Sequence, residues 1–376
     1  MTIDSPHATP ELLFDIRSTT WGGRSCFATR DIPKDTVLLE LKDKTGSSIQ
    51  YEFRKEVCHY CFKYSHGKSM KFKIDRSHIE PLIFPKQSLW LKSRLSKFRG
   101  AGLWFCSEEC LHSYLSIPKI IDLIEIYEIL LDNYSKMQKR ENPDDSMEEK
   151  LNSVKISQPI IDSMWNEMET HWIPSVNKTK ITKRERFLPV ISEDEYSCAR
   201  FIADTLFHIN SYDPESNTMK SFWNLQSNEL NKMKRFPILL HFQQLVFKTL
   251  YILLPETYKS QMMIPVFRHI MGSEYGNAFG IWQENESVDS REYFGYWVFP
   301  RASYFNHSCA PNIAKSRIGN KMYFTLNKDV HCDDELCIDY SGVLELDTIK
   351  RRNFLNENWF FECQCQRCKS EIQTCH

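Results

Sequence analysis

The chain has 376 residues, 41% of them hydrophobic and 26% charged, and a formal net charge of −1. This length exceeds one ordinary core and suits two or three packed units. No apolar run reaches the roughly 18 residues that a membrane span needs, and the polar residues 1–11 are unlike a signal peptide. We therefore expect a protein of the cytoplasm, the nucleus or both, where clustered cysteines favour metal ligation over disulfides.

The first part of the chain is expected to be rich in strands. Residues 12–57 contain short apolar runs at 26–28 and 36–39, and these runs are separated by the Pro- and Asp-containing turn chemistry of residues 31–35. Residues 58–115 then carry two pairs of cysteines.

The middle of the chain is expected to be helical. Apolar residues at helical spacing predict helices over residues 117–137 and 239–253, the second ending before Pro255. Ser192 and Glu195 form a capping-box pattern for a third helix. The polar residues 136–159 suggest a mobile linker. From Phe267 onward we expect short strands separated by turns at Gly, Asn and Pro residues.

Two groups of cysteines have metal-ligand spacing. Cys58 and Cys61 with Cys106 and Cys110 give four sulfur ligands, enough for one closed structural zinc site. The 44 residues between these pairs form a loop, whose closure cost grows slowly with length. The alternative is a set of buried cysteines at chance spacing.

The second group lies near the C-terminus, where Cys363, Cys365 and Cys368 fall within six residues. Zinc prefers four tetrahedral ligands, and Cys309 is the candidate for the fourth. The alternative is a tail of free thiols, which would be prone to oxidation.

Other cysteines and histidines are given plainer interpretations. Cys375 is assigned no role. We expect small core residues at Cys26, Cys198, Cys332 and Cys337. His59, His66 and His112 are spare ligand candidates for the first zinc site, and the plainer interpretation is that they are ordinary surface histidines.

Charge is unevenly distributed. Residues 62–99 contain ten lysines and arginines against two acids, whereas residues 141–149 contain five acids and no base. The plain interpretation is two solvated loops. The functional alternative is that segment 62–99 binds an acidic partner, nucleic acid included.

Four segments, taken in chain order, resemble one family. Residues 22–32 (GGRSCFATRDI) are similar to the opening strand of a SET domain, and residues 306–312 (NHSCAPN) match its most characteristic motif. Residues 334–340 (DELCIDY) resemble the segment that ends in its active-site tyrosine, and residues 361–368 (FECQCQRC) resemble its post-SET zinc motif. The inserted cysteine pairs narrow the resemblance to the SET-and-MYND (SMYD-like) subgroup, and to a fungal member of it.

The resemblance implies an α+β architecture. It comprises a β-rich SET fold with a pseudo-knot, a helical insert, a degenerate MYND-like zinc finger and a post-SET zinc motif. The finger of this subgroup holds two zinc ions, but this chain has the ligands of only one of those sites. Together with the post-SET motif, the resemblance therefore implies two structural zinc ions for the whole chain. The expected domains are the N-terminal part of SET at 12–57, the finger at 58–115, a helical linker and insert at 116–266, core SET at 267–345 and post-SET at 346–376.

The resemblance also implies an activity, S-adenosylmethionine-dependent N-methylation of a lysine in a histone or non-histone protein. Tyr340 would be the catalytic tyrosine, and Trp359 stands where relatives often have a second tyrosine of the lysine channel. Ser25 replaces a glycine common in the family. The expected cofactor-binding residues are Gly23, Arg24, Asn277, Asn306, His307 and Phe361.

These roles have structural alternatives. Asn277 could be a turn residue, His307 a purely structural hydrogen-bonding residue, Tyr340 a core aromatic and Phe361 a packing residue of the zinc turn. An alternative from another class is a cofactor- or peptide-binding module without turnover, suggested by Ser25, Trp359 and the reduced finger. We expect a monomer that binds a lysine-bearing protein or peptide and no membrane.

Overall fold

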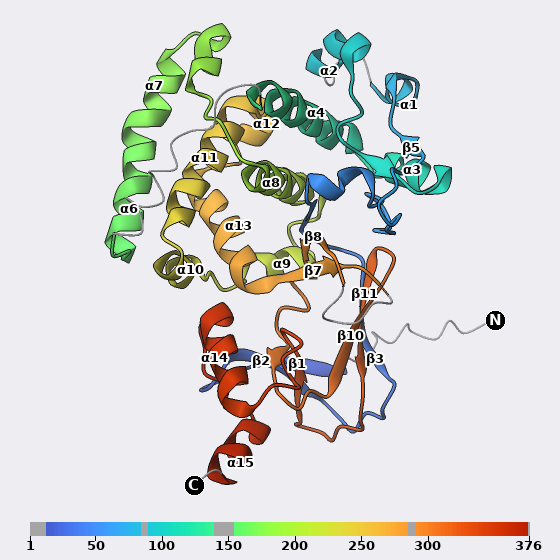
Figure 1. Ribbon diagram of the computed structural model, residues 1–376, viewed down its shortest axis with the longest axis vertical. Helices are drawn as coiled ribbons and strands as arrows, with labels where there is room; N and C mark the ends of the chain where they lie inside the picture. The colour runs from blue at the N-terminus through green and yellow to red at the C-terminus, as the bar shows by residue number, and fades with distance from the viewer. Residues whose placement is uncertain (1–12, 84–88, 139–153, 285–290, 375–376) are drawn as a thin grey trace, which may run out of the picture. The chain divides into compact units, whose positions relative to one another are not determined.

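The computed structural model describes residues 13–83, 89–138, 154–284 and 291–374 (Figure 1). Contacts divide the chain into two compact units. The first combines the residues up to Lys42 with those from Arg301 onward, and the second runs from Asp43 to Pro300. These units are defined by packing and not by sequence modules, so the five domain boundaries stay predictions.

The first unit contains a four-stranded sheet that joins distant parts of the chain. Its order is β1 (Phe14–Thr19), β2 (Gly23–Ala28), β12 (Glu335–Ile338) and β9 (Asn306–His307). Strand β12 is antiparallel to β2 and parallel to β9. Gly23, which opens β2, has φ +69°, a left-handed conformation that favours glycine. The sheet thereby brings residues 23–25, 306–307 and the segment leading to 340 together.

A second sheet and two helices complete this unit. The sheet has the order β10 (Ile313–Ile318), β11 (Lys321–Leu326) and β3 (Val37–Leu41). Helix α14 (Thr348–Trp359) begins where the Asp347 side chain accepts from Lys350 N, and it ends at Phe360, whose φ is +62°. Helix α15 (Gln366–Thr374) follows. The strands predicted from residues 26–28 and 36–39 are confirmed as β2 and β3.

The second unit is built mainly from helices. Its long helices are α4 (Ile120–Met137), α8 (Glu193–Ser211), α11 (Ile238–Leu253) and α13 (Ile264–Asn277), whose apolar faces share one core. The shorter helices are α1 (Arg76–Ile79), α2 (Leu89–Arg94), α3 (Glu108–Leu115), α6 (Gln158–Glu167), α7 (Ile173–Lys178), α9 (Asn217–Trp223), α10 (Glu229–Arg235) and α12 (Glu256–Lys259). The strands form the sheet β4 (Gly46–Ile49), β8 (Tyr293–Val298), β7 (Ala278–Trp282) and the pair β5 (Phe72–Lys73), β6 (Trp104–Phe105).

The helix predictions are largely confirmed. Helix α4 begins at Ile120, three residues after the expected start, because Lys119 has the left-handed φ of +60°. Helix α11 matches the expected 239–253 within one residue. The capping box is present, since Ser192 Oγ accepts from Glu195 N and Glu195 accepts from Ser192 N.

The strand texture expected from Phe267 onward is wrong at its start. Helix α13 occupies Ile264–Asn277, with Pro265 in its first turn and Phe267 buried, and strands begin only with β7. Gly272 and Gly276 suggested turns, but they lie inside the helix. A Cβ at either glycine would meet a side chain from residues 227–228, so close packing explains them.

Some expectations fall outside the described residues, namely the acidic run 141–149, the middle of the expected linker and Cys375. The ends of the 136–159 linker are helical, in α4 and α6. Within the described ranges, no helix is both long and apolar enough to span a membrane.

Candidate functional site

The four predicted C-terminal cysteines converge in the first unit. The sulfur atoms of Cys309, Cys363, Cys365 and Cys368 all lie within 4.8 Å of one another. Cys309 Sγ lies 3.8 Å from Cys363 Sγ and 3.5 Å from Cys368 Sγ. Four sulfurs converging in a largely buried cluster fit a tetrahedral zinc ion.

Two arginines surround this cluster and were not foreseen. Arg351 is only 1% exposed. It donates to Leu346 O at 2.6 Å and to Glu371 at 2.5 Å, and its Nη2 lies 3.9 Å from Cys368 Sγ. Arg367 donates to Cys309 O at 3.0 Å and to Glu371 at 2.8 Å. Since a zinc ion with four thiolates carries a net negative charge, two guanidinium groups here would offset it.

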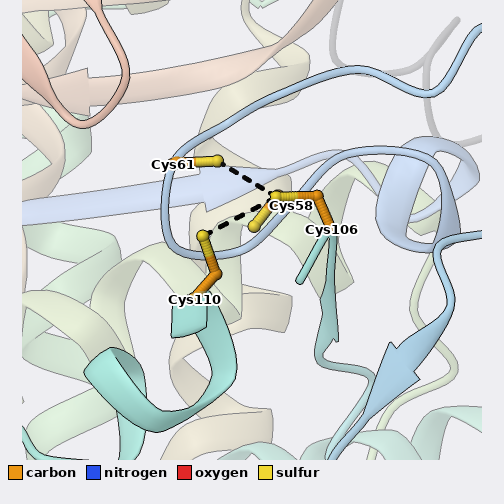
Figure 2. A group of neighbouring side chains, drawn as sticks. All are labelled: Cys58, Cys61, Cys106 and Cys110. Carbon is orange, nitrogen blue, oxygen red and sulfur yellow. Dashed lines mark hydrogen bonds between the residues drawn. The ribbon is translucent and has the colours of Figure 1, made fainter. Parts of the chain in front are cut away.

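The N-terminal cysteines converge in the second unit, as Figure 2 shows. Cys61 Sγ lies 3.5 Å from Cys106 Sγ, which lies 3.6 Å from Cys110 Sγ. The segments that carry the two cysteine pairs meet where His59 N donates to Trp104 O at 2.9 Å. Ser107 caps α3 by accepting from Cys110 N at 3.2 Å. This four-sulfur set also fits zinc with no open coordination position.

One of the three expected surface histidines is wrongly placed. His66 and His112 are exposed, but His59 is half-buried. Its Nδ1 accepts from Trp104 N at 3.1 Å, and burial lowers its pKa to about 3. The neutral ring therefore joins the two segments that carry the cysteine pairs. The position of His59 directly after the proposed ligand Cys58 was the sequence signal that could have indicated its burial.

One of the four expected core cysteines is also wrong. Cys26, Cys198 and Cys337 are buried, but Cys332 is exposed. It lies in the turn before β12, where Cys332 N donates to Asp31 Oδ1 at 2.9 Å. Of the residues from 330 to 334, only Val330 is buried, and residues 331–334 form the exposed turn that contains Cys332.

Tyr340 lies just beyond β12, close to His307. Tyr340 N donates to His307 Nδ1 at 3.1 Å, and the Tyr340 hydroxyl donates to Phe305 O at 3.1 Å. Burial raises the pKa of Tyr340 above its ordinary value and lowers that of His307 to about 4. At neutral pH the site therefore holds a protonated phenol and a neutral imidazole.

Aromatic rings surround Tyr340. The ring centroid of Tyr340 lies 5.5 Å from His307, 6.0 Å from Trp359 and 6.2 Å from Phe361. Trp359 ends α14 and Phe361 precedes the cysteine cluster, so the two rings come from the same short segment. The structure thus brings the expected catalytic residue Tyr340 together with Trp359 of the expected channel and with the expected cofactor residues His307 and Phe361.

The turn between β1 and β2 meets β9. Asn306 Nδ2 lies 3.5 Å from Gly22 O, and a Cβ on Gly22 would lie only 2.6 Å from that Nδ2. Around Gly23 a Cβ would meet nothing within 4 Å, so this position borders open space. The Arg24 guanidinium lies 4.9 Å from the ring centroid of Tyr304. Gly22 and Tyr304 were not predicted as site residues. The adjacent pair Gly22–Gly23 was the sequence signal that could have indicated Gly22.

Ser25 is accommodated where the family often has glycine. It is completely buried, and its hydroxyl donates to Glu335 Oε1 at 2.5 Å. The exposed Trp21 also donates to the Glu335 carboxylate, at 3.3 Å. Glu335 therefore holds both sides of the turn that contains Gly22 and Gly23.

Asn312 is a further residue of the Asn-His-Ser-Cys segment that was not assigned a role. Its Nδ2 donates to Glu335 O at 2.8 Å, and its Oδ1 accepts from Cys337 N at 2.8 Å. This side chain ties the segment after β9 to β12. The repeated asparagine in residues 306–312 was the available signal.

Asn277 lies in the second unit, as the last residue of α13. Its Nδ2 donates to Ser273 O at 2.7 Å and to Gln226 O at 3.3 Å. These bonds describe a helix-terminal residue, and its assignment to the cofactor stays a prediction.

Comparison of the sequence with models of known protein families identifies the class of protein to which this site belongs. Residues 23–341 match the model of the SET domain. The chain belongs to the SET-domain family, and the predicted α+β SET fold is confirmed.

Individual relatives agree with this membership. A Saccharomyces cerevisiae protein named "Potential protein lysine methyltransferase SET6" is 55% identical over 376 residues, 100% of each chain. A "SET and MYND domain-containing protein" of Dictyostelium discoideum is 36% identical over 108 residues, 29% of this chain and 25% of that protein. A "Histone-lysine N-methyltransferase SET5" of Eremothecium gossypii is 39% identical over 75 residues, 20% and 15% of the two chains. Fungal and SET-and-MYND relatives are thus both found, as expected.

Proposed function

We propose that the protein is an S-adenosylmethionine-dependent protein-lysine N-methyltransferase. The observation that carries the proposal is the convergence of Tyr340, His307 and Asn306 with the Gly22–Gly23 turn around the sheet β1-β2-β12-β9 of a SET-family chain. The full-length yeast relative, whose name describes a potential lysine methyltransferase, supports the same activity.

The cofactor would supply an electrophilic methyl group on a sulfonium. Gly23, Arg24, Asn306, His307 and Phe361 would hold it, with Asn277 as the sixth residue. The residues of the first unit fit this role, because open space borders Gly23 and the Asn306 amide makes only a weak contact with Gly22 O. Aromatic side chains beside these polar groups suit an adenine ring with a charged tail.

Tyr340 would orient the attacking lysine amine. Methyl transfer is an in-line displacement, and correct positioning in such reactions can supply about 7–11 kcal/mol. The Tyr340 hydroxyl donates to Phe305 O, so its oxygen keeps lone pairs that can accept from an amine. Because burial raises the Tyr340 pKa, this group would act as a neutral orienting hydroxyl and not as a base.

The lysine must attack as a neutral amine. The partly buried rings of Tyr340, Trp359 and Phe361 lie close together and would shield an amine from water. Such desolvation lowers the pKa of an amine. No dedicated side-chain base is then required. One zinc ion in each cysteine cluster would be structural, because four thiolates leave no open coordination position.

The proposed activity is tested by radiolabelled methyl transfer to cell-extract proteins, with Tyr340→Phe as the variant. We expect the wild type to label protein lysines and the variant to lose at least about tenfold in kcat, since phenylalanine cannot orient an amine by hydrogen bonding. Tyr323→Phe, on β11 of the same unit, is the matched control and should label as the wild type does. Equal incorporation by wild type and Tyr340→Phe would contradict the role of Tyr340.

A binding module without turnover is the second candidate. It is favoured by Trp359, whose indole lies 6.0 Å from the Tyr340 ring and offers one donor and no acceptor. Calorimetry with S-adenosylmethionine and the zinc-loaded protein separates the cases when combined with the labelling assay. Binding without labelling would favour the module.

We also propose that segment 62–99 binds an acidic partner, nucleic acid included. Of its nine described lysines and arginines, all but Arg94 are exposed. Arg76 pairs with Glu80 and Arg94 with Asp132, at 3.0 and 3.4 Å. Lys73 lies 5.6 Å from the ring centroid of Trp104. The other six have no ion-pair partner among the described residues: Lys63, Lys68, Lys71, Lys92, Lys97 and Arg99. Binding to heparin resin or RNA that weakens when these six become glutamine would support the proposal.

From the sequence we further propose that the protein is a monomer, that it acts in the cytoplasm, the nucleus or both, and that it binds no membrane. Size-exclusion chromatography with light scattering and fluorescence microscopy of a tagged chain test them.

A further inference from the structure

We infer that the His307 side chain is a positioning residue, which couples metal occupancy of the C-terminal cysteine cluster to the placement of Tyr340. The C-terminal cluster here means Cys309, Cys363, Cys365 and Cys368. The inference rests on the proposed function, because the placement of Tyr340 matters for catalysis only if its hydroxyl orients the reacting amine.

The His307 ring lies between the two groups that it would couple. Its side chain is 0% exposed. Its Nδ1 accepts from Tyr340 N at 3.1 Å, and its Nε2 lies 3.4 Å from Cys309 Sγ. One ring thus contacts a cluster sulfur on one side and the backbone of the proposed catalytic tyrosine on the other.

The two contacts determine which ring nitrogen carries the proton. A backbone N–H can only donate, so Nδ1 must be the unprotonated nitrogen of a neutral ring. The proton is then on Nε2, which faces Cys309 Sγ. A metal-bound thiolate accepts such an N–H, whereas a free thiol is a weaker acceptor. The hydrogen bond should therefore strengthen when metal binds the cluster.

The neighbouring carboxylate does not compete for this ring. Asp339 Oδ1 lies 3.7 Å from His307 Nδ1, beyond hydrogen-bond distance. The Asp339 carboxylate accepts instead from Ser341 N at 3.1 Å and Gly342 N at 2.8 Å. Asp339 thus shapes the turn after Tyr340 and leaves Nδ1 to the Tyr340 amide.

Pairing of β9 with β12 restricts the movement of His307 relative to Tyr340. Ser308 N donates to Ile338 O at 3.0 Å, directly beside His307. Tyr340 is held at its amide by His307 and at its hydroxyl by Phe305 O, so both anchors come from residues 305–307. A metal ion that fixes Cys309 would hold the His307 ring, and through it the Tyr340 backbone.

Two substitutions separate the halves of this linkage. His307→Asn keeps an acceptor near the Nδ1 position for Tyr340 N but is too short to reach Cys309. His307→Gln places an amide N–H near the Nε2 position for Cys309 but lacks the acceptor at Nδ1. The experiment uses the full chain loaded with cadmium, whose NMR signals report the two cysteine clusters, and selective labelling of tyrosine amides.

We expect each variant to change a different signal. His307→Asn should shift the cadmium resonance of the C-terminal cluster and leave the Tyr340 amide resonance near its wild-type position. His307→Gln should do the reverse. Both zinc-loaded variants should lose about 10- to 100-fold in kcat. The KM for S-adenosylmethionine should change little, because His307 would hold the cofactor through its backbone, which both variants keep. A packing role alone would move both signals together in either variant, and that result would overturn the inference.

A measurement on the wild type needs no variant to fold. Gradual chelation should shift the Tyr340 amide in step with loss of the C-terminal cadmium signal, while the amide of Tyr323 stays in place. Equal shifts of both tyrosines, or of neither, would overturn the linkage. A wild type that shows this linkage but transfers no methyl group would contradict the proposed function and support the linkage, so the two failures are distinguishable.

Discussion

At the residue scale, the site depends on a few close approaches. Gly22 allows the Asn306 amide to lie beside the β1–β2 turn, and Ser25 and Trp21 share the Glu335 carboxylate. In the sequence, Ser25 was one of the features that suggested a module without turnover. Its burial and its bond to Glu335 instead show how a serine fits where relatives often have glycine.

Gly22→Ala should weaken S-adenosylmethionine binding about tenfold, because the new Cβ would lie 2.6 Å from Asn306 Nδ2 and rotate that amide away. Calorimetry measures the change. The control is the Asn306→Ala background, in which Gly22→Ala should cost little more, since residues in contact are not additive. Fully additive losses in the double variant would contradict this explanation.

At the element scale, helices α14 and α15 are joined around the C-terminal cluster. The Glu371 carboxylate on α15 accepts from Arg351 on α14 and from Arg367 on α15. Hydrogen bonds from Thr348, Arg351 and Arg367 lower the pKa of Glu371 to about 2. Both guanidinium groups also approach the cluster, so the ion-pair network and the metal site support the same helix pair.

Arg351→Met should lower metal affinity at the C-terminal cluster about 10- to 100-fold, because it removes a buried charge beside Cys368. Competition with a coloured chelator measures the affinity. Arg352→Met is the matched control, because Arg352 pairs with Glu362 on the surface at 2.9 Å and such pairs contribute little. Equal metal affinity in both variants would show that Arg351 does not stabilise the cluster.

At the scale of the whole molecule, each packing unit contains one four-cysteine cluster. The first unit also contains five of the six proposed cofactor residues, and Asn277 alone lies in the second. The finger therefore packs in a different unit from Tyr340 and five of the six proposed cofactor residues.

Metal counting tests this separation. The wild type should bind two zinc ions per chain, and Cys110→Ser and Cys365→Ser should each bind one, as measured by elemental analysis. Cys110→Ser should still bind S-adenosylmethionine within about threefold of wild type. Cys365→Ser should lose at least about tenfold, because loss of the metal would loosen the segment of Phe361 and, through Cys309, the His307 ring. Equal losses in both would contradict the separation.

The sequence by itself was sufficient for the family, the α+β class, both cysteine sets and most long helices. The family and the fold class followed from the resemblance of four short motifs to SET domains. The cysteine sets and the helices followed from local spacing: cysteines two to four residues apart, apolar residues at helical intervals, and a capping box. It also placed Tyr340 and His307 in recognisable motifs. Local spacing misled at Phe267, where glycines inside α13 resembled turns, and at Cys332 and His59, whose exposure depends on distant partners.

Only the tertiary structure decided which atoms meet. Glu335 reaches Ser25, Asn312 bridges to β12, Arg351 lies beside Cys368, and His307 contacts both Cys309 and Tyr340. These partners are separated in sequence by up to 310 residues. The physical reason is that such contacts depend on strand order and helix packing, which are set by the burial of the whole chain and not by any short segment.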